Sequence, residues 1–303
     1  MANDKDDRKT YGLLGKNINY SLSPAMHNAA FRHFGIPAEY KLFDVRENEL
    51  DGFVRDRVLT GEISGFNVTV PYKMKMREVL EKIPIPEENF ANWVRITGAL
   101  NTVKVEKENI TAYNTDIGGF YKSLVEDAKY DPQQGGAIFV IGAGGAGRAL
   151  SLYLAHLTGL KTSVNVYDTE KERLDSLEDA FKRGWCQEDS PPDKLYLVKS
   201  TADIPKRLQN CRLVINATPL GTKEGDPLPV NFDYLKKGQV VYDLVYARET
   251  ELLKLAKEKG LVAVNGLGML VNQAALSFEI WTGMSSGETR PVMRSALEEK
   301  MGK

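Results

Sequence analysis

The sequence predicts an α/β protein, and three observations lead to this class. Strand-like and helix-like segments alternate along almost the whole chain, an order typical of helices packed on the faces of a sheet. One apolar run rich in β-branched residues, at residues 137–141, leads directly into the glycine-rich residues 142–147. Further strands separated by helices follow, and that order predicts a doubly wound parallel sheet.

The first third of the chain carries the first predicted helix and four predicted strands. The helix is expected over residues 24–34, with Ser23 as its N-cap and Pro24 at its first position, where proline is well tolerated. Gly35-Ile36-Pro37 ends this helix. The strands are predicted at residues 10–14, 39–43, 63–70 and 102–105.

The rest of the chain repeats the alternation. Strands are predicted at residues 163–167, 195–198, 213–216, 240–244 and 262–264, and helices at residues 115–129, 145–158, 249–259 and 268–282. A domain boundary is expected near the helix at 115–129, before the loop at 131–136. The last of these helices is strongly apolar and is expected to cross back onto the first domain. The predicted domains are therefore residues 1–117 with 266–303, and residues 118–265.

Composition excludes several classes of protein. The chain has 303 residues with 40 basic and 41 acidic side chains, so the sequence indicates neither a nucleic-acid-binding surface nor an acidic tail. The polar residues 1–8 do not resemble a signal peptide, and no apolar run approaches the roughly 20 residues of a membrane span. A cytoplasmic protein without membrane or nucleic-acid partners is expected.

Cysteine and histidine usage predicts no metal site. Cys186 and Cys211 form neither a disulfide framework nor a zinc pattern. His27, His33 and His156 are scattered along predicted helices, where packing or surface roles are more common than metal binding or catalysis.

The glycine-rich stretch predicts a dinucleotide site. Gly142 allows a tight turn, Gly144 lets a pyrophosphate approach the backbone, and Gly147 lets helix and strand pack closely. The phosphate charge would meet the N–H groups at the helix N-terminus. Asp168 follows about twenty residues later, at the end of the next strand, where such units place a ribose-binding acid. A glycine turn that binds nothing is the alternative, and the preceding strand and following helix argue against it.

The first domain offers polar groups for a substrate. Ser21 and Ser23 precede a helix N-terminus and could hold a carboxylate, although Ser23 could equally be a simple N-cap. Lys73 lies just past a predicted strand end, where α/β sheets place their sites, but most lysines are solvated surface charges. Asp116 could be a first-turn helix acid, and Asn101 could be a turn residue.

Taken together, these segments resemble the motifs of shikimate dehydrogenases, in order, from Tyr11 to Gly283. The matching segments are Ser21-Leu-Ser23-Pro24-Ala-Met-His27-Asn28, Asn67-Val-Thr69-Val-Pro71-Tyr-Lys73, Gly98-Ala-Leu-Asn101-Thr102, Asn114-Thr115-Asp116, the glycine loop, Asn216-Ala-Thr218-Pro219-Leu220-Gly221, Asp243-Leu-Val-Tyr246 and Gly266-Leu-Gly268-Met269-Leu-Val-Asn272-Gln273-Ala274.

The resemblance implies reversible reduction of 3-dehydroshikimate to shikimate with a nicotinamide cofactor. It also implies a substrate domain, a Rossmann-type cofactor domain and an active site in the cleft between them. Lys73 and Asp116 would be the catalytic pair, with Lys73 stabilising the developing alkoxide and handing over a proton. The implied substrate residues are Ser21, Ser23, Thr69, Asn101, Gln273 and Tyr246. The implied cofactor residues are Gly142, Ala143, Gly144, Gly145, Ala146, Gly147, Asp168, Thr218 and Gly266.

The cofactor itself departs from the family pattern. NADP-using members carry an Asn-Arg-Thr type sequence at the second strand, whose arginine grips the 2′-phosphate, and here Asp168 falls on the arginine position. A carboxylate favours ribose hydroxyls and repels a phosphate, so NAD is predicted over the NADP usual in the family, with Lys171 and Arg173 offsetting part of the repulsion.

Several alternatives stay open at this stage. An NAD-dependent quinate dehydrogenase, or one acting on both quinate and shikimate, is the first of them, and the paired serines favour shikimate. A sensor that binds a dinucleotide or metabolite without catalysis is the second, and the intact pair of Lys73 and Asp116 argues against it. A monomer or homodimer is expected.

Overall fold

The computed structural model describes residues 8–107, 109–157, 162–184 and 194–302. The chain divides into two compact units, Met1–Gly119 with Val271–Lys303, and Phe120–Leu270. The bounds of these units differ from those of the predicted domains by only a few residues. The first unit therefore corresponds to the predicted substrate domain and the second to the predicted dinucleotide domain. Cys186 and residues 1–7 lie outside the described part of the chain.

The first unit is built on a five-stranded mixed sheet in the order β2-β1-β3-β4-β5. Strand β1 pairs in parallel with β2 and β3, whereas β3, β4 and β5 pair antiparallel. The strands are β1 (Lys9–Gly15), β2 (Ala38–Asp44), β3 (Gly65–Val68), β4 (Thr102–Glu106) and β5 (Asn109–Tyr113). Helices of this unit are α1 (Ser23–His33), α2 (Leu50–Phe53), α3 (Lys75–Leu80), α4 (Asn92–Thr97) and α11 (Ser286–Lys300), with parts of α5 (Thr115–Glu126) and α10 (Leu267–Thr282).

Alternating side chains of this sheet build a core on each face. Leu14 and Phe66 pack into one core with residues of α2, α3 and α4. On the other face, Tyr11 stacks with Phe31 of α1 at 5.3 Å between ring centroids, and the ring of Trp281 of α10 lies tilted against Tyr11 at 5.0 Å. The residues at the carboxyl ends of β1 and β3 are thereby held between two packed layers.

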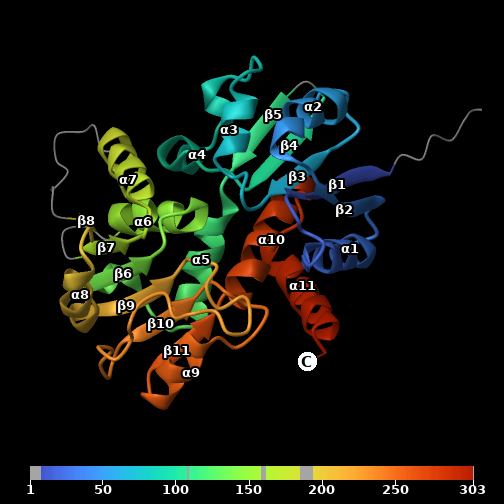
Figure 1. The fold of residues 1–303 in the computed structure, drawn as a ribbon. Helices are drawn as coiled ribbons and strands as arrows, with labels where there is room; N and C mark the ends of the chain where they lie inside the picture. The colour runs from blue at the N-terminus through green and yellow to red at the C-terminus, as the bar shows by residue number, and fades with distance from the viewer. Residues whose placement is uncertain (1–7, 108, 158–161, 185–193, 303) are drawn as a thin grey trace, which may run out of the picture. The chain divides into compact units, whose positions relative to one another are not determined.

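The second unit is a six-stranded parallel sheet in the order β11-β10-β9-β6-β7-β8 (Figure 1). The strands are β6 (Ala137–Ile141), β7 (Val164–Tyr167), β8 (Leu195–Leu197), β9 (Cys211–Asn216), β10 (Val240–Asp243) and β11 (Val262–Asn265). Chain order reverses between β6 and β9, and in open α/β sheets such a switch point is where ligands bind.

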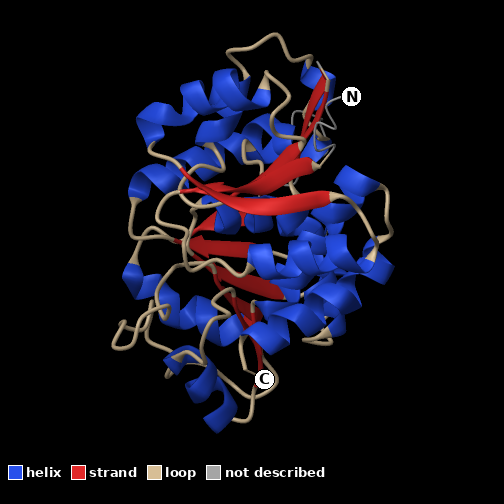
Figure 2. Cartoon of the chain, turned by 90° about the vertical axis from the view of Figure 1, so that its right-hand side faces the viewer, coloured by secondary structure: helices blue, strands red, loops and turns tan. Residues whose placement is uncertain are grey.

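Helices cover both faces of this sheet (Figure 2). Ile138 and Val140 face a core shared with α5, α6 (Gly145–Leu157) and α7 (Lys171–Gly184). Phe139 and Ile141 face the opposite core, with α8 (Ile204–Asn210) and α9 (Glu251–Glu258). The predicted α/β class and the doubly wound parallel sheet are confirmed. Within the described residues, no helix has the length and apolar character needed to span a membrane.

One local prediction was wrong. Helix α1 begins at Ser23 itself, Leu22 occupies the cap position, and no side chain caps the helix. The Ser23 hydroxyl instead accepts a hydrogen bond from the Ser21 hydroxyl at 3.2 Å. The N-cap alternative for Ser23 is therefore excluded, and its hydroxyl is available for other chemistry.

Candidate functional site

Lys73 and Asp116 form an ion pair in the first unit. The Lys73 ammonium lies 2.5 Å from Asp116 Oδ2, and the two side chains are 14% and 7% exposed. Lys73 follows β3, and its carbonyl accepts a hydrogen bond from Leu100 N at 3.0 Å, which fixes the backbone here. Asp116 occupies the first turn of α5. The pairing gives Lys73 a buried carboxylate partner, which a solvated surface lysine would lack.

Asn101 connects this pair to a second predicted substrate residue. Asn101 is 2% exposed, and its Nδ2 donates to Asp116 Oδ1 at 3.0 Å and reaches Gln273 Oε1 at 3.4 Å. Its Oδ1 accepts from the backbone N–H of Thr115 at 2.7 Å. Lys73, Asn101, Asp116 and Gln273, which lie far apart in the sequence, therefore meet in one cluster of the first unit.

The two serines also lie together. Ser23 is 7% exposed, and its backbone N–H donates to the Ser21 hydroxyl at 3.3 Å. Burial raises the pKa of Tyr40 well above its ordinary value, and a hydrogen bond with Ser23 partly opposes that rise. Thr69 is held by its backbone N–H, which donates to Leu14 O at 2.9 Å. Tyr246 belongs to the second unit, in the segment that follows β10.

A buried polar network behind these residues was missed by the sequence analysis. Asn67 is its centre: Oδ1 accepts from the Tyr40 hydroxyl at 2.8 Å, and Nδ2 donates to Thr102 Oγ1 at 3.0 Å and Ser277 Oγ at 2.9 Å. Thr102 Oγ1 in turn donates to Asn101 Oδ1 at 3.1 Å. The signal was available, because an asparagine within an otherwise apolar strand must find hydrogen-bond partners.

The glycine loop of the second unit has the geometry that the sequence predicts. Gly142 has φ of +98°, which favours glycine. A Cβ on Gly147 would lie 1.9 Å from Gly142 O, so the start of α6 packs directly on the loop. A Cβ on Gly144 would meet nothing within 4 Å. Open space at Gly144, beside the N–H groups that begin helix α6, fits a dinucleotide pyrophosphate.

Asp168 ties the next strand to this loop. Its Oδ2 accepts from Ala143 N at 2.7 Å and its Oδ1 accepts from Glu170 N at 2.9 Å. Arg173 Nη1 lies 3.7 Å from Oδ2, and the Asp168 side chain is 5% exposed. The sequence analysis predicted a carboxylate directed at the cofactor, and the structure adds a second role in which the carboxylate orders the loop.

The remaining predicted cofactor residues lie at the carboxyl ends of β9 and β11. Thr218 donates its backbone N–H and its hydroxyl to Asn216 Oδ1, at 3.1 and 2.7 Å. Gly266 follows β11, where a Cβ would lie 2.1 Å from Leu244 O. Among the residues that the structure describes, no group of three or more His, Cys, Asp or Glu side chains could hold a metal ion.

Comparison with known proteins gives a consistent result. The family model for the shikimate dehydrogenase substrate binding domain matches residues 13–103, and that for the shikimate 5′-dehydrogenase C-terminal domain matches residues 266–298. A shikimate dehydrogenase (NADP(+)) of Methanopyrus kandleri is 36% identical over 96% of this chain and 95% of its own length. The chain belongs to the shikimate dehydrogenase family.

Solved structures agree with this membership in the shikimate dehydrogenase family. A shikimate dehydrogenase in complex with NADP+ has a TM-score of 0.82 and 31% identity, covering 98% of this chain and 96% of that one. A quinate dehydrogenase from Corynebacterium glutamicum in complex with NAD has a TM-score of 0.80 and 26% identity, covering 95% of this chain and 100% of that one. The predicted family resemblance is confirmed, and curated relatives such as the Methanopyrus enzyme do not favour the quinate alternative.

Proposed function

We propose that the protein catalyses the reversible reduction of 3-dehydroshikimate to shikimate with a nicotinamide dinucleotide. The 2.5 Å pair of Lys73 and Asp116, joined to Asn101, is the observation that carries this proposal. A sensor without catalytic activity has no need of an ammonium held by a buried carboxylate. Family membership supports the same substrate.

Residues of the first unit would supply both the proton transfer and the substrate binding. When bound, the nicotinamide supplies or accepts the hydride. Lys73 would stabilise the negative charge that develops on the substrate oxygen and donate the proton to it. Asp116 would keep Lys73 charged and oriented, since a neighbouring anion favours the ammonium form. Ser21 and Ser23 would anchor the carboxylate, while Asn101, Gln273 and Asp116 would bind ring hydroxyls.

Replacement of Lys73 tests this proposal. Lys73→Ala should lower turnover by at least about a hundredfold, the usual contribution of a general acid–base group. Nicotinamide absorbance during shikimate oxidation measures the rate. Lys75→Ala is the matched control, because Lys75 pairs with Glu78 at 2.8 Å on the exposed side of α3 and should leave the rate unchanged. A Lys73→Ala variant with most of the wild-type turnover would show that Lys73 does not donate the proton.

We also propose that NAD is preferred over NADP. Two basic side chains that follow Asp168 in the sequence already have carboxylate partners: Lys171 pairs with Asp175, and Arg173 lies 2.8 Å from Glu170. A 2′-phosphate would have to compete with Glu170 for Arg173 while approaching the Asp168 carboxylate. NADP remains the cofactor named for the curated relatives. Cytoplasmic location and a monomeric or dimeric state stay predictions.

Initial rates of shikimate oxidation with each cofactor test the preference. The wild type should favour NAD by about tenfold or more in kcat/KM, since like charges near 4 Å repel by about 4 kcal/mol at an effective dielectric constant near 20, and neighbouring basic side chains and solvent screen part of that repulsion. Asp168→Asn should shrink the preference, because the amide oxygen can still accept from Ala143 N while the charge is gone. Glu178→Gln, which removes a charge paired with Lys182 at 3.0 Å farther along α7, should leave it unchanged. A wild-type preference for NADP would refute the proposal.

A further inference from the structure

A buried acid of the second unit takes no part in the chemistry described above. Asp243 is the last residue of β10, and its side chain is fully buried. Its Oδ1 accepts from Asn216 Nδ2 at 2.9 Å and from Val245 N at 3.1 Å. Its Oδ2 accepts from the Thr250 hydroxyl at 2.6 Å. Burial raises the pKa of Asp243, and its hydrogen bonds with Thr250, Val245 and Asn216 oppose that rise.

Asn216 is the counterpart of Asp243 on the neighbouring strand. It ends β9, is also fully buried, and lies opposite Asp243 in the parallel register. Asn216 Oδ1 accepts both hydrogen bonds that Thr218 donates, and Asn216 Nδ2 reaches Leu220 O at 3.2 Å. Asn216 therefore holds the segment after β9 by hydrogen bonds, and Asp243 holds the segment after β10 in the same way. The two side chains also form a hydrogen bond with each other.

The two segments also touch directly. A Cβ on Gly221 would lie 2.9 Å from Thr250 Cγ2, so glycine permits the contact. A Cβ on Gly266 would lie 2.1 Å from Leu244 O, which brings the end of β11 against the segment after β10. The segment after β9 carries Thr218, the segment after β10 carries Tyr246, and Gly266 follows β11. Thr218 and Gly266 are predicted cofactor residues, and Tyr246 is a predicted substrate residue.

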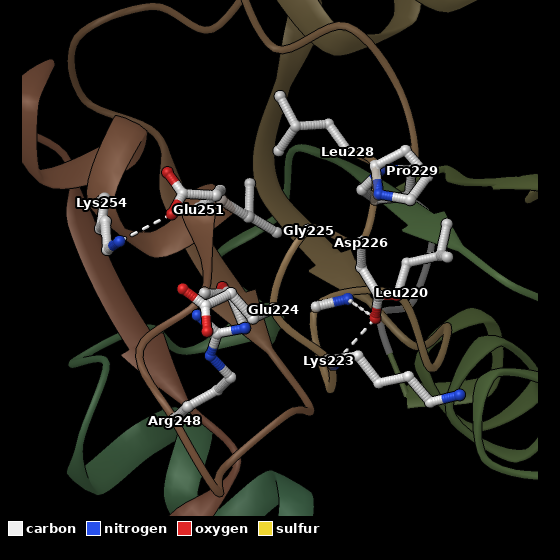
Figure 3. Close-up of a pocket in the computed structure, with 14 residues that line it drawn as sticks. Leu220, Lys223, Glu224, Gly225, Asp226, Leu228, Pro229, Arg248, Glu251 and Lys254 are labelled. Carbon is white, nitrogen blue, oxygen red and sulfur yellow. Dashed lines mark hydrogen bonds and ion pairs between the residues drawn. The ribbon is translucent and has the colours of Figure 1, made fainter.

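The outer side of the same segments lines a polar hollow (Figure 3). Gly221, Asp226, Arg248 and Thr250 are among its lining residues. There the Asp226 carboxylate accepts from Gly221 N at 3.0 Å and from Lys223 N at 2.9 Å. These two hydrogen bonds hold residues 221–226 in a turn. Asp226 thus acts within one segment, and the link between the two segments rests on Asn216, Asp243 and Thr250.

We infer that Asp243 is a positioning residue that, through Asn216 and Thr250, sets the arrangement of the segment after β9, which would bind the dinucleotide, against the segment after β10. The inference rests on the proposed function for the identity of the cofactor. A carboxylate suits this position because it can accept several donors on two oxygens, and charge-assisted hydrogen bonds are stronger than neutral ones. The location at the carboxyl ends of adjacent parallel strands is where α/β sheets bind such ligands.

Binding of NADH and NADPH to purified variants, followed by nicotinamide fluorescence, tests the inference without relying on turnover. Thr250→Val removes the hydroxyl that donates to Asp243 and that also accepts from Leu253 N as the N-cap of α9. It should raise the dissociation constant of the preferred cofactor by about tenfold. Thr250→Ser keeps the hydroxyl and should restore binding. Asp243→Asn keeps the shape of the side chain and an oxygen that can accept from Asn216 and Val245, but it removes the charge from all of these hydrogen bonds, so it should also weaken cofactor binding by about tenfold.

Tyr242→Phe is the matched control for a general loss of stability. Tyr242 precedes Asp243 on β10, is fully buried, and donates its hydroxyl to Ser123 at 2.7 Å, away from the two segments. Its cofactor affinity should stay at the wild-type value. Equal weakening in Thr250→Val and Tyr242→Phe would reduce the network to a structural role and overturn the inference, as would wild-type cofactor affinity in Asp243→Asn. Failure of the wild type to oxidise shikimate, with cofactor binding intact, would refute the proposed function alone.

Discussion

At the scale of single residues, burial of polar groups explains most of the site. Lys73, Asn101 and Asp116 are largely withdrawn from solvent, and each has partners that compensate for the lost hydration. Such groups are costly to keep inside a protein unless they are paired, so their placement is informative. The same reasoning applies to Asn67, whose hydrogen bonds hold Tyr40 and Thr102 behind the cluster.

His27 is a buried group with a different consequence. Its side chain is fully buried, and its ring stacks on Tyr40 with 4.2 Å between centroids and 6° between planes. Neither ring nitrogen has a hydrogen-bond partner among the described residues. Burial lowers the pKa of His27 to about 3. The packing role expected from the sequence agrees with this environment.

The lowered pKa predicts an acid-sensitive stability. The unfolded chain takes up a proton on His27 below about pH 6.5, while the folded chain does not until about pH 3. Protonation of His27 in the unfolded chain alone therefore lowers the free energy of unfolding progressively as the pH falls from about 6.5 to about 3. Between pH 7 and 5 the loss should be about 2 kcal/mol. Urea unfolding at pH 7 and pH 5 measures the free energy of unfolding of the wild type and of His27→Phe. The decrease between the two pH values should be smaller in His27→Phe by that amount, and equal decreases in the two proteins would contradict the prediction.

At the scale of elements, the sequence predicted what periodicity and glycine chemistry control. Strand β6, helix α6 and the turn at Gly142 follow from the apolar run and the glycines alone. Strand β5 (Asn109–Tyr113) was missed, because it is short and polar at its start and depends on antiparallel pairing with β4. The predicted N-cap of α1 was wrong because the Ser23 hydroxyl accepts a hydrogen bond from the Ser21 hydroxyl and does not cap the helix.

The candidate site was likewise predicted only in part. Lys73, Asn101, Asp116 and Gln273 were predicted as a set from the family resemblance, and the structure brings them together. Tyr40 and Ser277 were not predicted. Tyr40 lies in an ordinary strand sequence and Ser277 in an ordinary apolar helix, and their importance arises from contacts with Asn67, far away in the chain.

Two glycines of the loop should respond differently to the same substitution. Gly147→Ala would place a Cβ 1.9 Å from Gly142 O and should lower both stability and dinucleotide affinity. Gly144→Ala meets no atom within 4 Å, so its thermal unfolding should match the wild type. If the pyrophosphate approaches this backbone, Gly144→Ala should still weaken NADH binding by about tenfold or more. Thermal unfolding and NADH titration measure the two effects, and unchanged NADH affinity in Gly144→Ala would move the pyrophosphate elsewhere.

At the scale of the whole molecule, chemistry and cofactor recognition are assigned to different units. The proposed catalytic pair and most of the proposed substrate residues belong to Met1–Gly119 with Val271–Lys303, while the glycine loop, Asp168 and the Asp243 network belong to Phe120–Leu270. Each unit has its own sheet and its own buried core. The hydrogen bonds described for the Lys73 cluster lie within the first unit, and those described for the glycine loop and the Asp243 network lie within the second.

This division predicts that each ligand protects its own unit in hydrogen exchange. Shikimate alone should slow amide exchange around residues 67–73, 101–102 and 115–116, and NADH alone should slow it around residues 142–148, 216–221 and 243–246. At about 100 times the dissociation constant, protection of amides that exchange through unfolding of the unit should approach a hundredfold. Peptides from α3, a helix of the first unit, serve as the control for NADH and should change little with it. Protection of residues 67–73 by NADH alone, with none at 142–148, would contradict the assignment of the dinucleotide to the second unit.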